Sequence, residues 1–229
     1  ENFNFGKSEI IKEQSRIVIL AKSHDQIGEF EKAFKYFEKA NEISLNINNK
    51  FVNKKKTLNM IEKRTNFFKD NKVKNWKQFN SESKESPPIF IIGFPRSGTT
   101  LLDTILSSHP LIEVIEEKPI IENWIKEIQK EVDNDLKYLH NINENSAQKF
   151  RKMYFDLRNK NIKKNNGKKI YIDKMPLNII YAGEILRIFP DAKFIMALRH
   201  PCDCVLSCFM QSFEMNDAMS NFLNLEDSA

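Results

Sequence analysis

The feature that most constrains the fold is a glycine-containing loop that directly follows a short apolar segment. Residues 89–92 are all apolar, and residues 93–100 read Gly-Phe-Pro-Arg-Ser-Gly-Thr-Thr before an apolar helical pattern begins. A continuous apolar run of this length predicts a strand buried on both faces, as in parallel sheets. Gly93 and Gly98 let the loop fold so that its backbone N–H groups point inward at the positive end of the following helix. The loop therefore predicts a binding site for a phosphate-like dianion.

Further strand and helix patterns extend this unit into an α/β domain. Residues 169–172 predict a second strand, residues from about 178 to 189 a helix, and residues 193–198 a third strand. Residues 119–165, which precede them, are helical in pattern. A strand, a helix and a strand in this order form the crossover from which parallel sheets are built. We therefore expect the fold class to be α/β, with a P-loop-like parallel sheet flanked by helices.

The N-terminal part predicts a helical hairpin. Residues 8–47 have the pattern of two helices interrupted at Gly28. The second helix places Ala33, Phe37 and Ala40 where a tetratricopeptide repeat has the small and aromatic residues that let two helices pack closely. The alternative is a helix pair of no special family. Because repeat arrays need about three units for stability, either further repeats precede this pair or the pair docks on the next domain.

A polar segment that ends in two prolines, residues 81–88, predicts a domain boundary. We therefore expect a helical appendage with its connector over residues 1–80 and an α/β domain over residues 87–229. The last residues show no structural close, so we expect the α/β domain to continue beyond them.

Composition argues against several classes of function. The net charge of +5 arises in residues 1–86, which hold 18 Lys and Arg against 12 Asp and Glu, so the α/β domain has no basic excess for nucleic acid. No apolar run approaches the ~20 residues of a membrane span, and the first residues do not resemble a secretory signal. We therefore expect a cytoplasmic protein. Three cysteines within residues 202–208 lack the spacing of a metal site or a disulfide framework, and we expect neither.

The loop departs from the motif of nucleoside triphosphate hydrolases. That motif, G-x-x-x-x-G-K-[ST], has a lysine where this chain has Thr99. Because this lysine reaches the outer phosphates, its absence disfavours an ordinary triphosphate hydrolase. Arg96 instead offers a permanently charged, forked donor to a phosphate or sulfate oxygen.

The loop and the two leucines after it, P-R-S-G-T-T-L-L, resemble the loop of sulfotransferases, in particular the bacterial tetratricopeptide-fused sulfotransferases and the tyrosylprotein sulfotransferases. The resemblance runs from about Phe90 to Phe213 and keeps five segments in order. These are the loop, residues 108–110 (Ser-His-Pro), the pair Glu116 and Glu117, residues 173–178, and residues 189–194 leading to 199–203. It implies transfer of a sulfuryl group from 3′-phosphoadenylyl sulfate to a hydroxyl acceptor, such as a protein tyrosine or a glycan, without a metal.

The resemblance implies a role for each residue of the loop. The residues that would hold the 5′-phosphosulfate, through backbone N–H groups and threonine hydroxyls, are Ser97, Gly98, Thr99 and Thr100. Arg96 would neutralise charge on the leaving phosphate. The alternative for the two threonines is that they only cap the helix.

Three residues outside the loop complete the expected donor site. Lys174, at the carboxyl end of the second strand, would donate to the bridging oxygen or to the sulfuryl group; the alternative is a surface lysine in a turn fixed by Pro176. Arg199 and Ser207 would hold the 3′-phosphate of the donor, a group that ATP lacks.

The same resemblance implies that Glu117 is the base that deprotonates the acceptor. Glu116 stands beside it, where the family often has glycine, and remains the alternative base. A third interpretation is that both are surface acids in a loop before Pro119.

Two other functions compete with a sulfotransferase. One is a P-loop phosphoryl-transfer kinase, which the residue at position 99 and the pair Arg199 and Ser207 disfavour. The other is a non-catalytic protein in which the tetratricopeptide-like helices bind a protein partner and the α/β domain is degenerate. The presence of Arg96, Glu117 and Lys174 argues against that second alternative.

Overall fold

The computed structural model describes residues 7–48, 50–69, 76–79, 85–163, 167 and 169–229. The chain divides into two compact units, one formed by Glu1–Met60 with His200–Ala229 and the other by Ile61–Arg199. The helix α3 (Lys54–Lys69) includes the point at which the first unit gives way to the second.

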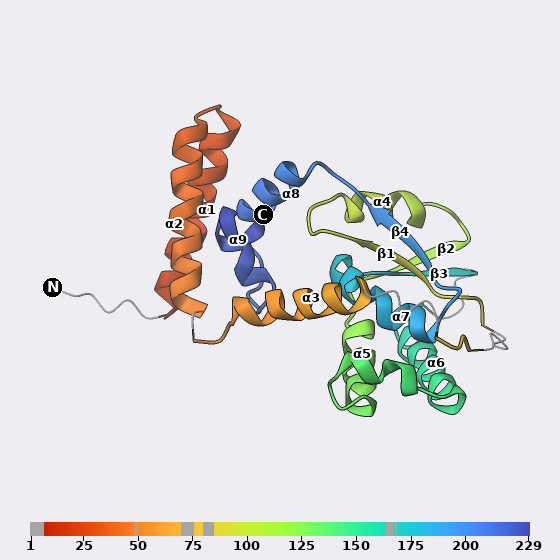
Figure 1. Ribbon diagram of the computed structural model, residues 1–229. Coiled ribbons are helices and arrows are strands. Elements are labelled where there is room, and N and C mark those ends of the chain that lie inside the picture. The colour runs from red at the N-terminus through yellow and green to blue at the C-terminus, as the bar shows by residue number, and fades with distance from the viewer. Residues whose placement is uncertain (1–6, 49, 70–75, 80–84, 164–166, 168) are drawn as a thin grey trace. The chain divides into compact units, whose positions relative to one another are not determined.

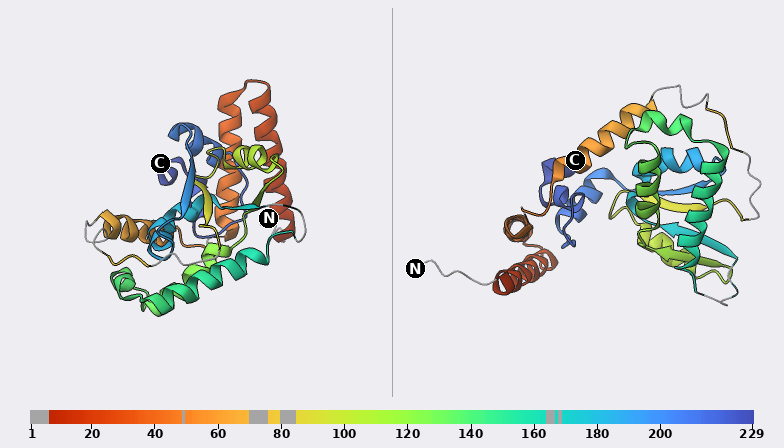
Figure 2. Two further views of the ribbon diagram at one scale, coloured as in Figure 1. Left: turned by 90° about the vertical axis from the view of Figure 1, so that its right-hand side faces the viewer. Right: turned by 90° about the horizontal axis from the view of Figure 1, so that it is seen from below.

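A parallel sheet of four strands organises the unit of residues 61–199 (Figure 1). The strands are β1 (Ile89–Gly93), β2 (Ile112–Glu116), β3 (Ile170–Lys174) and β4 (Lys193–Ala197), in the order β2-β3-β1-β4. Every pairing in this sheet is parallel. This confirms the predicted α/β fold, and Figure 2 presents the sheet from two further directions.

The sequence does not predict β2. Its patterns place no strand between the helix that follows the loop and residue 119. Residues 112–116 read Ile-Glu-Val-Ile-Glu, so two acidic side chains interrupt the apolar ones, and only Ile115 of this strand is buried. An edge strand with one covered face lacks the continuous apolar run that marks β1. The interpretation that placed Glu116 in a loop before Pro119 is therefore wrong for this residue, because Glu116 is the last residue of β2.

Helices cover both faces of the sheet (Figure 1). On one face lies α4 (Thr99–Ser107), which follows the loop. On the other lie α5 (Ile120–Glu131), the 3-10 helix η2 (Leu136–Asn141), α6 (Glu144–Asn159) and α7 (Ala182–Ile188). These confirm the helical pattern read from residue 119 as far as Asn159; residues 164 and 165 lie outside the described residues. The helix expected from residue 178 begins instead as the 3-10 helix η3 (Pro176–Tyr181), with the proline in its first turn.

An aromatic core joins the second face to its helices. Phe90 of β1 packs against Tyr154 of α6, with ring centroids 5.8 Å apart, and Trp124 of α5 donates from Nε1 to the Phe150 carbonyl at 2.9 Å. Pairing the indole N–H allows this large side chain to be buried completely. The core therefore anchors the same strands whose carboxyl ends carry the candidate site.

The described part of the other unit, residues 7–48, 50–60 and 200–229, is helical. Its helices are α1 (Lys7–Gln26), α2 (Phe30–Asn48), α8 (Pro201–Phe209), the 3-10 helix η4 (Met219–Leu223) and α9 (Leu225–Ser228). The predicted hairpin is confirmed, with Gly28 at a φ of 81° in the turn. Asn41 of α2 donates to the Phe209 carbonyl at 2.9 Å, so the hairpin and the C-terminal helices share one core. No helix in the described ranges is long and apolar enough to cross a membrane.

Candidate functional site

The loop between β1 and α4 requires glycine at both of its ends. A Cβ on Gly93 would lie 2.7 Å from Ser97 Oγ and 2.8 Å from the Ala197 carbonyl oxygen, which is closer than real contacts allow. Gly98 has a φ of 100°, in the left-handed region that favours glycine. The Ser97 N–H bonds to the Phe94 carbonyl at 3.1 Å and closes the turn. The loop is therefore compact and lies tight against the end of β4.

The first turn of α4 offers donors that no side chain caps. Gly98 is the N-cap residue, and it has no side chain to accept the N–H groups that a helix start leaves unpaired. The alternative in which Thr99 or Thr100 caps this helix is therefore wrong, because both lie inside its first turn.

Ser97 contributes a buried hydroxyl to the same loop. Its side chain is in a residue only 7% exposed, and Oγ finds no hydrogen-bond partner among the described residues. A buried polar group left unpaired costs about 1–3 kcal/mol. Such a group at the start of an uncapped helix fits a site that an anion completes.

One arginine lies within the loop and a second lies beside it. Arg96, within it, is exposed and has a φ of 66°, an unusual conformation for a side-chain-bearing residue that is found at ligand sites. Arg199 follows β4 and donates from Nη1 to the Arg96 carbonyl at 3.2 Å. The structure thus brings the guanidinium of Arg199 to the loop. Ser207 lies in α8, which belongs to the other compact unit, so its expected pairing with Arg199 stays a prediction.

Lys174 ends β3 and lies in a cluster of carboxylates. Its Nζ is 2.8 Å from Glu117 Oε1, 3.0 Å from Glu116 Oε1 and 3.9 Å from Asp103 Oδ2. The lysine side chain is 0% exposed, so the alternative of a surface lysine is wrong. Burial by itself lowers the pKa of Lys174, but the hydrogen bonds to Glu117 and Glu116 outweigh it, and the pKa is raised above its ordinary value. The ammonium therefore stays charged.

The register of the sheet brings the two glutamates to this lysine. Glu116 pairs with Lys174 across β2 and β3, and the Glu117 N–H continues the pairing to the Lys174 carbonyl at 2.8 Å. Their side chains remain 58% and 54% exposed, so both can be reached from solvent. Both glutamates therefore are exposed acids, as the third interpretation has it, but each is paired with Lys174, and the two stay alternatives for the base.

Asp103 is a member of the cluster that the sequence reading missed. It lies one helical turn after Thr99 on α4, is buried, and accepts from the Ser107 hydroxyl at 3.0 Å. A signal was present, since residues four apart on a helix share a face and Thr99 already belonged to the predicted site. Asp103 thus links the helix of the loop to Lys174.

Asp173 is the second residue that the reading missed. It precedes Lys174 on β3, is 1% exposed, and neither carboxylate oxygen finds a partner among the described residues. Burial raises the pKa of this carboxyl to about 7. Burial, and then the charge of Asp173, raises the pKa of the Tyr154 hydroxyl in the aromatic core.

Cys202, Cys204 and Cys208 form no disulfide with one another. Among the residues that the structure describes, no group of three or more His, Cys, Asp or Glu is arranged to hold a metal ion.

Comparison with known proteins gives this geometry a context. A protein of Aquifex aeolicus (strain VF5), described as uncharacterized, is 29% identical over 212 residues, which cover 89% of this chain and 27% of that protein. The chain therefore spans about a quarter of the length of this relative. A family model described as the sulfotransferase family matches residues 87–228, more than half of the chain and all of the candidate site. The chain belongs to the sulfotransferase family.

Proposed function

We propose that the chain transfers a sulfuryl group from 3′-phosphoadenylyl sulfate to a hydroxyl acceptor, with a glutamate as base. Membership of the sulfotransferase family supports sulfuryl transfer in general. The observation that carries the donor assignment is the uncapped start of α4 with the buried, unpartnered hydroxyl of Ser97 beside it. Backbone N–H groups in this arrangement complement a dianion such as a phosphosulfate.

The positive charges around the loop support a donor with two anionic ends. Arg96 and the loop N–H groups would hold the 5′-phosphosulfate, and Arg199 would hold the 3′-phosphate with Ser207. The hydrogen bond from Arg199 to the Arg96 carbonyl supports these two separate roles, because it keeps the Arg199 guanidinium at the edge of the loop that would hold the 5′-phosphosulfate. ATP would leave the 3′-phosphate partners unused.

In the transfer step, the acceptor oxygen forms a bond to sulfur while the bond from sulfur to the bridging phosphate oxygen breaks. The proton of the acceptor hydroxyl passes to a carboxylate, which we assign to Glu117, and the electron pair stays on the departing phosphate. Lys174 holds Glu117 at 2.8 Å and orients it. Its ammonium would stabilise the bridging oxygen if one of its glutamate bonds were exchanged for a donor oxygen.

The helical hairpin supports a second, separate role in binding a protein partner. Ala33 and Ala40 are buried on α2 together with Phe37, which is the packing that a tetratricopeptide-like unit uses. We propose that this hairpin is such a unit. A non-catalytic function for the whole chain is disfavoured, because Lys174 and the glutamates are assembled as a transfer site would need them.

The experiment that tests the donor compares ligands in thermal unfolding. 3′-Phosphoadenosine 5′-phosphate should raise the midpoint temperature more than AMP or ATP at the same concentration, because only it carries the 3′-phosphate. In Arg199→Ala the preference should disappear, while Arg16→Ala, at an exposed helical position, should keep it. Equal stabilisation of the unmodified protein by ATP would exclude the proposed donor and favour a phosphoryl-transfer enzyme.

A further inference from the structure

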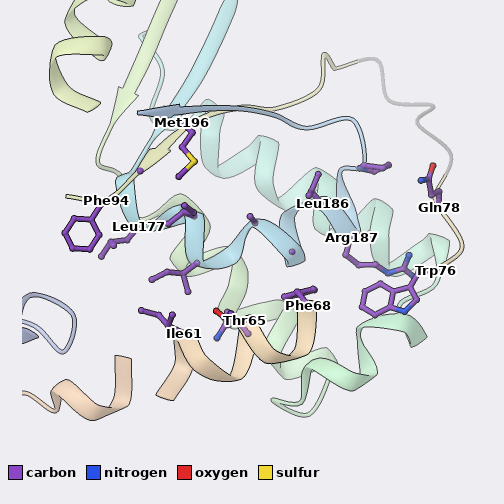
Figure 3. Close-up of a pocket in the computed structure, with 17 residues that line it drawn as sticks. Ile61, Thr65, Phe68, Trp76, Gln78, Phe94, Leu177, Leu186, Arg187 and Met196 are labelled. Atoms are coloured by element: carbon purple, nitrogen blue, oxygen red, sulfur yellow. The ribbon is translucent and has the colours of Figure 1, made fainter. Parts of the chain in front are cut away.

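A pocket and a charged cluster both adjoin the loop between β1 and α4. The pocket has a volume of about 980 Å³, is lined mostly by apolar side chains of α3, η3 and α7, and reaches the loop at Phe94 (Figure 3). Lys174, Glu116 and Glu117 are not among its lining residues. The candidate base and the lysine that holds it therefore lie outside the pocket, in a cluster that also contains Asp103.

The helix α4 buries polar side chains and exposes apolar ones. Thr99 and Asp103 are its two buried residues, whereas Leu101 is 67% exposed and Ile105 is 58% exposed. A helix that only completed a hydrophobic core would turn its apolar face inward, because burying a carboxylate costs free energy unless the carboxylate is paired. The buried position of Asp103 therefore points to a partner on the sheet.

Lys174 is the partner of Asp103. Asp103 Oδ2 lies 3.9 Å from Lys174 Nζ, while Asp103 Oδ1 accepts from the Ser107 hydroxyl at 3.0 Å. The hydrogen bond from Ser107, on the same helix, restrains the carboxylate and leaves its other oxygen toward the ammonium. At 3.9 Å the contact with Lys174 is an ion pair and not a hydrogen bond. Asp103 is therefore a fixed negative charge just beyond hydrogen-bonding distance of Lys174.

The two glutamates hold Lys174 in a different way. Glu117 Oε1 and Glu116 Oε1 accept hydrogen bonds of 2.8 Å and 3.0 Å from Nζ, which occupy two of the three N–H groups of the ammonium. Both glutamate side chains are more than half exposed, so substrates can compete for these bonds. Glu117 also has a φ of 48°, a left-handed conformation that costs free energy in a residue with a side chain. The bonds to the glutamates are therefore the exchangeable ones.

The proposed reaction removes one of these bonds. Glu117 becomes neutral when it takes the acceptor proton, and Lys174 exchanges a glutamate oxygen for an oxygen of the donor. The lysine side chain is 0% exposed, so water does not replace the lost carboxylate, and a buried ammonium without a partner is costly. A third carboxylate that stays charged throughout would keep the ammonium charged and in place during the transfer.

We propose that Asp103 is a positioning residue, which holds Lys174 at the donor oxygen while Glu117 acts as the base. The inference rests on the proposed function and adds a residue to its site. Asp103 acts through Lys174, needs no contact with donor or acceptor, and neither gains nor loses a proton in the transfer. Ser107 supports it by restraining its second oxygen. The competing explanation is that Asp103 only anchors α4 to the sheet.

Calorimetric titration with 3′-phosphoadenosine 5′-phosphate tests this role without an acceptor, because the oxygen that bridges to sulfur in the donor remains on the 5′-phosphate. Asp103→Asn keeps the shape and removes the charge, and it should weaken binding about fivefold or more. The direction matters, because removing a negative charge near an anion would by itself strengthen binding. Asp103→Glu keeps the charge and should lose less affinity than Asp103→Asn. The matched control is Asp156→Asn, at an exposed position of α6, which should bind as the unmodified protein does.

A double-mutant cycle separates positioning from anchoring of the helix. In a Lys174→Met background, Asp103→Asn should change the affinity by less than about twofold, because Asp103 acts only through the lysine. A loss of affinity that persists in this background would mean that Asp103 only anchors α4, and it would overturn the inference. If Lys174→Met fails to fold or to bind, Ser107→Ala takes its place: it releases Asp103 Oδ1 and should weaken binding in the same direction by less than Asp103→Asn, and unchanged affinity would overturn the inference.

The same titrations distinguish this inference from the proposed function. If the unmodified protein binds 3′-phosphoadenosine 5′-phosphate and Asp103→Asn binds it as tightly or more tightly, the positioning role alone is wrong. If the unmodified protein does not bind this nucleotide, the proposed function is wrong and the positioning role is excluded with it.

Discussion

The carboxyl group of Asp173 should make the stability of this protein depend on pH in a direction opposite to that of most acids. The residue lies within β3 between Phe90 and Ile115 of the neighbouring strands, and both its oxygens lack partners among the described residues. Burial raises its pKa from the ordinary value of 3.8 to about 7. The folded chain therefore holds the proton over a pH range in which the unfolded chain has released it.

The sign follows from proton linkage. Between pH 4 and 7 the folded state binds more protons at this site than the unfolded state, so the free energy of unfolding falls as pH rises. The stability associated with the neutral carboxyl is fully present below pH 4 and is lost once pH passes 7. Each unit of pKa difference corresponds to about 1.4 kcal/mol, and a difference of about 3 units gives about 4 kcal/mol as an upper value.

Asp173→Asn removes this pH dependence, because the amide is close in shape and neutral throughout. Urea unfolding followed by tryptophan fluorescence should show the variant more stable than the unmodified protein by only about 1 kcal/mol at pH 4.5 and by up to about 4 kcal/mol at pH 8. Asp191→Asn, an exposed carboxylate in a turn, is the matched control and should change neither value. A variant that is less stable than the unmodified protein at pH 8 would refute the reasoning, because it would mean that the ionised carboxylate is satisfied.

Two further predictions concern the site itself. Glu117→Gln should lower the rate of sulfuryl transfer by about 100-fold or more with donor-product binding retained, since it removes the proton acceptor but keeps the shape. The same assay on Glu116→Gln should show a much smaller loss, and a larger loss there would move the base to Glu116. Gly93→Ala should weaken binding of 3′-phosphoadenosine 5′-phosphate in calorimetry about tenfold or more, because its Cβ would meet Ser97 Oγ at 2.7 Å and the Ala197 carbonyl at 2.8 Å and force the loop open; unchanged affinity would contradict the proposed cradle.

Much of the fold could be read from local patterns. The apolar run before the loop, the glycines at 93 and 98, and the hairpin interrupted at Gly28 all act within a few residues, so their structures follow from spacing and backbone freedom. The strand β2 could not be read in this way. It is short and lies at the edge of the sheet, and its mixed apolar and acidic side chains do not mark a strand until the segment is paired with β3.

In the candidate site, too, some features could be predicted from contiguous sequence and others could not. The loop of residues 93–100, which includes Arg96, is contiguous in sequence, and the resemblance to sulfotransferases rests on such contiguous segments. Lys174 and Glu117 were predicted as separate residues, whereas their hydrogen bond of 2.8 Å depends on the register between two strands far apart in the chain. Asp103 joins them only because α4 lies over that sheet edge.

The sequence by itself determined that this chain has a glycine-containing loop at the start of a helix and an α/β fold around it, because both follow from local apolar spacing and glycine conformation. Only the tertiary structure decided that Lys174 is buried among carboxylates, that Asp173 is buried without a partner, and that an apolar pocket opens beside the loop. These features depend on parallel pairing and helix packing between distant segments, for which short-range spacing carries no signal.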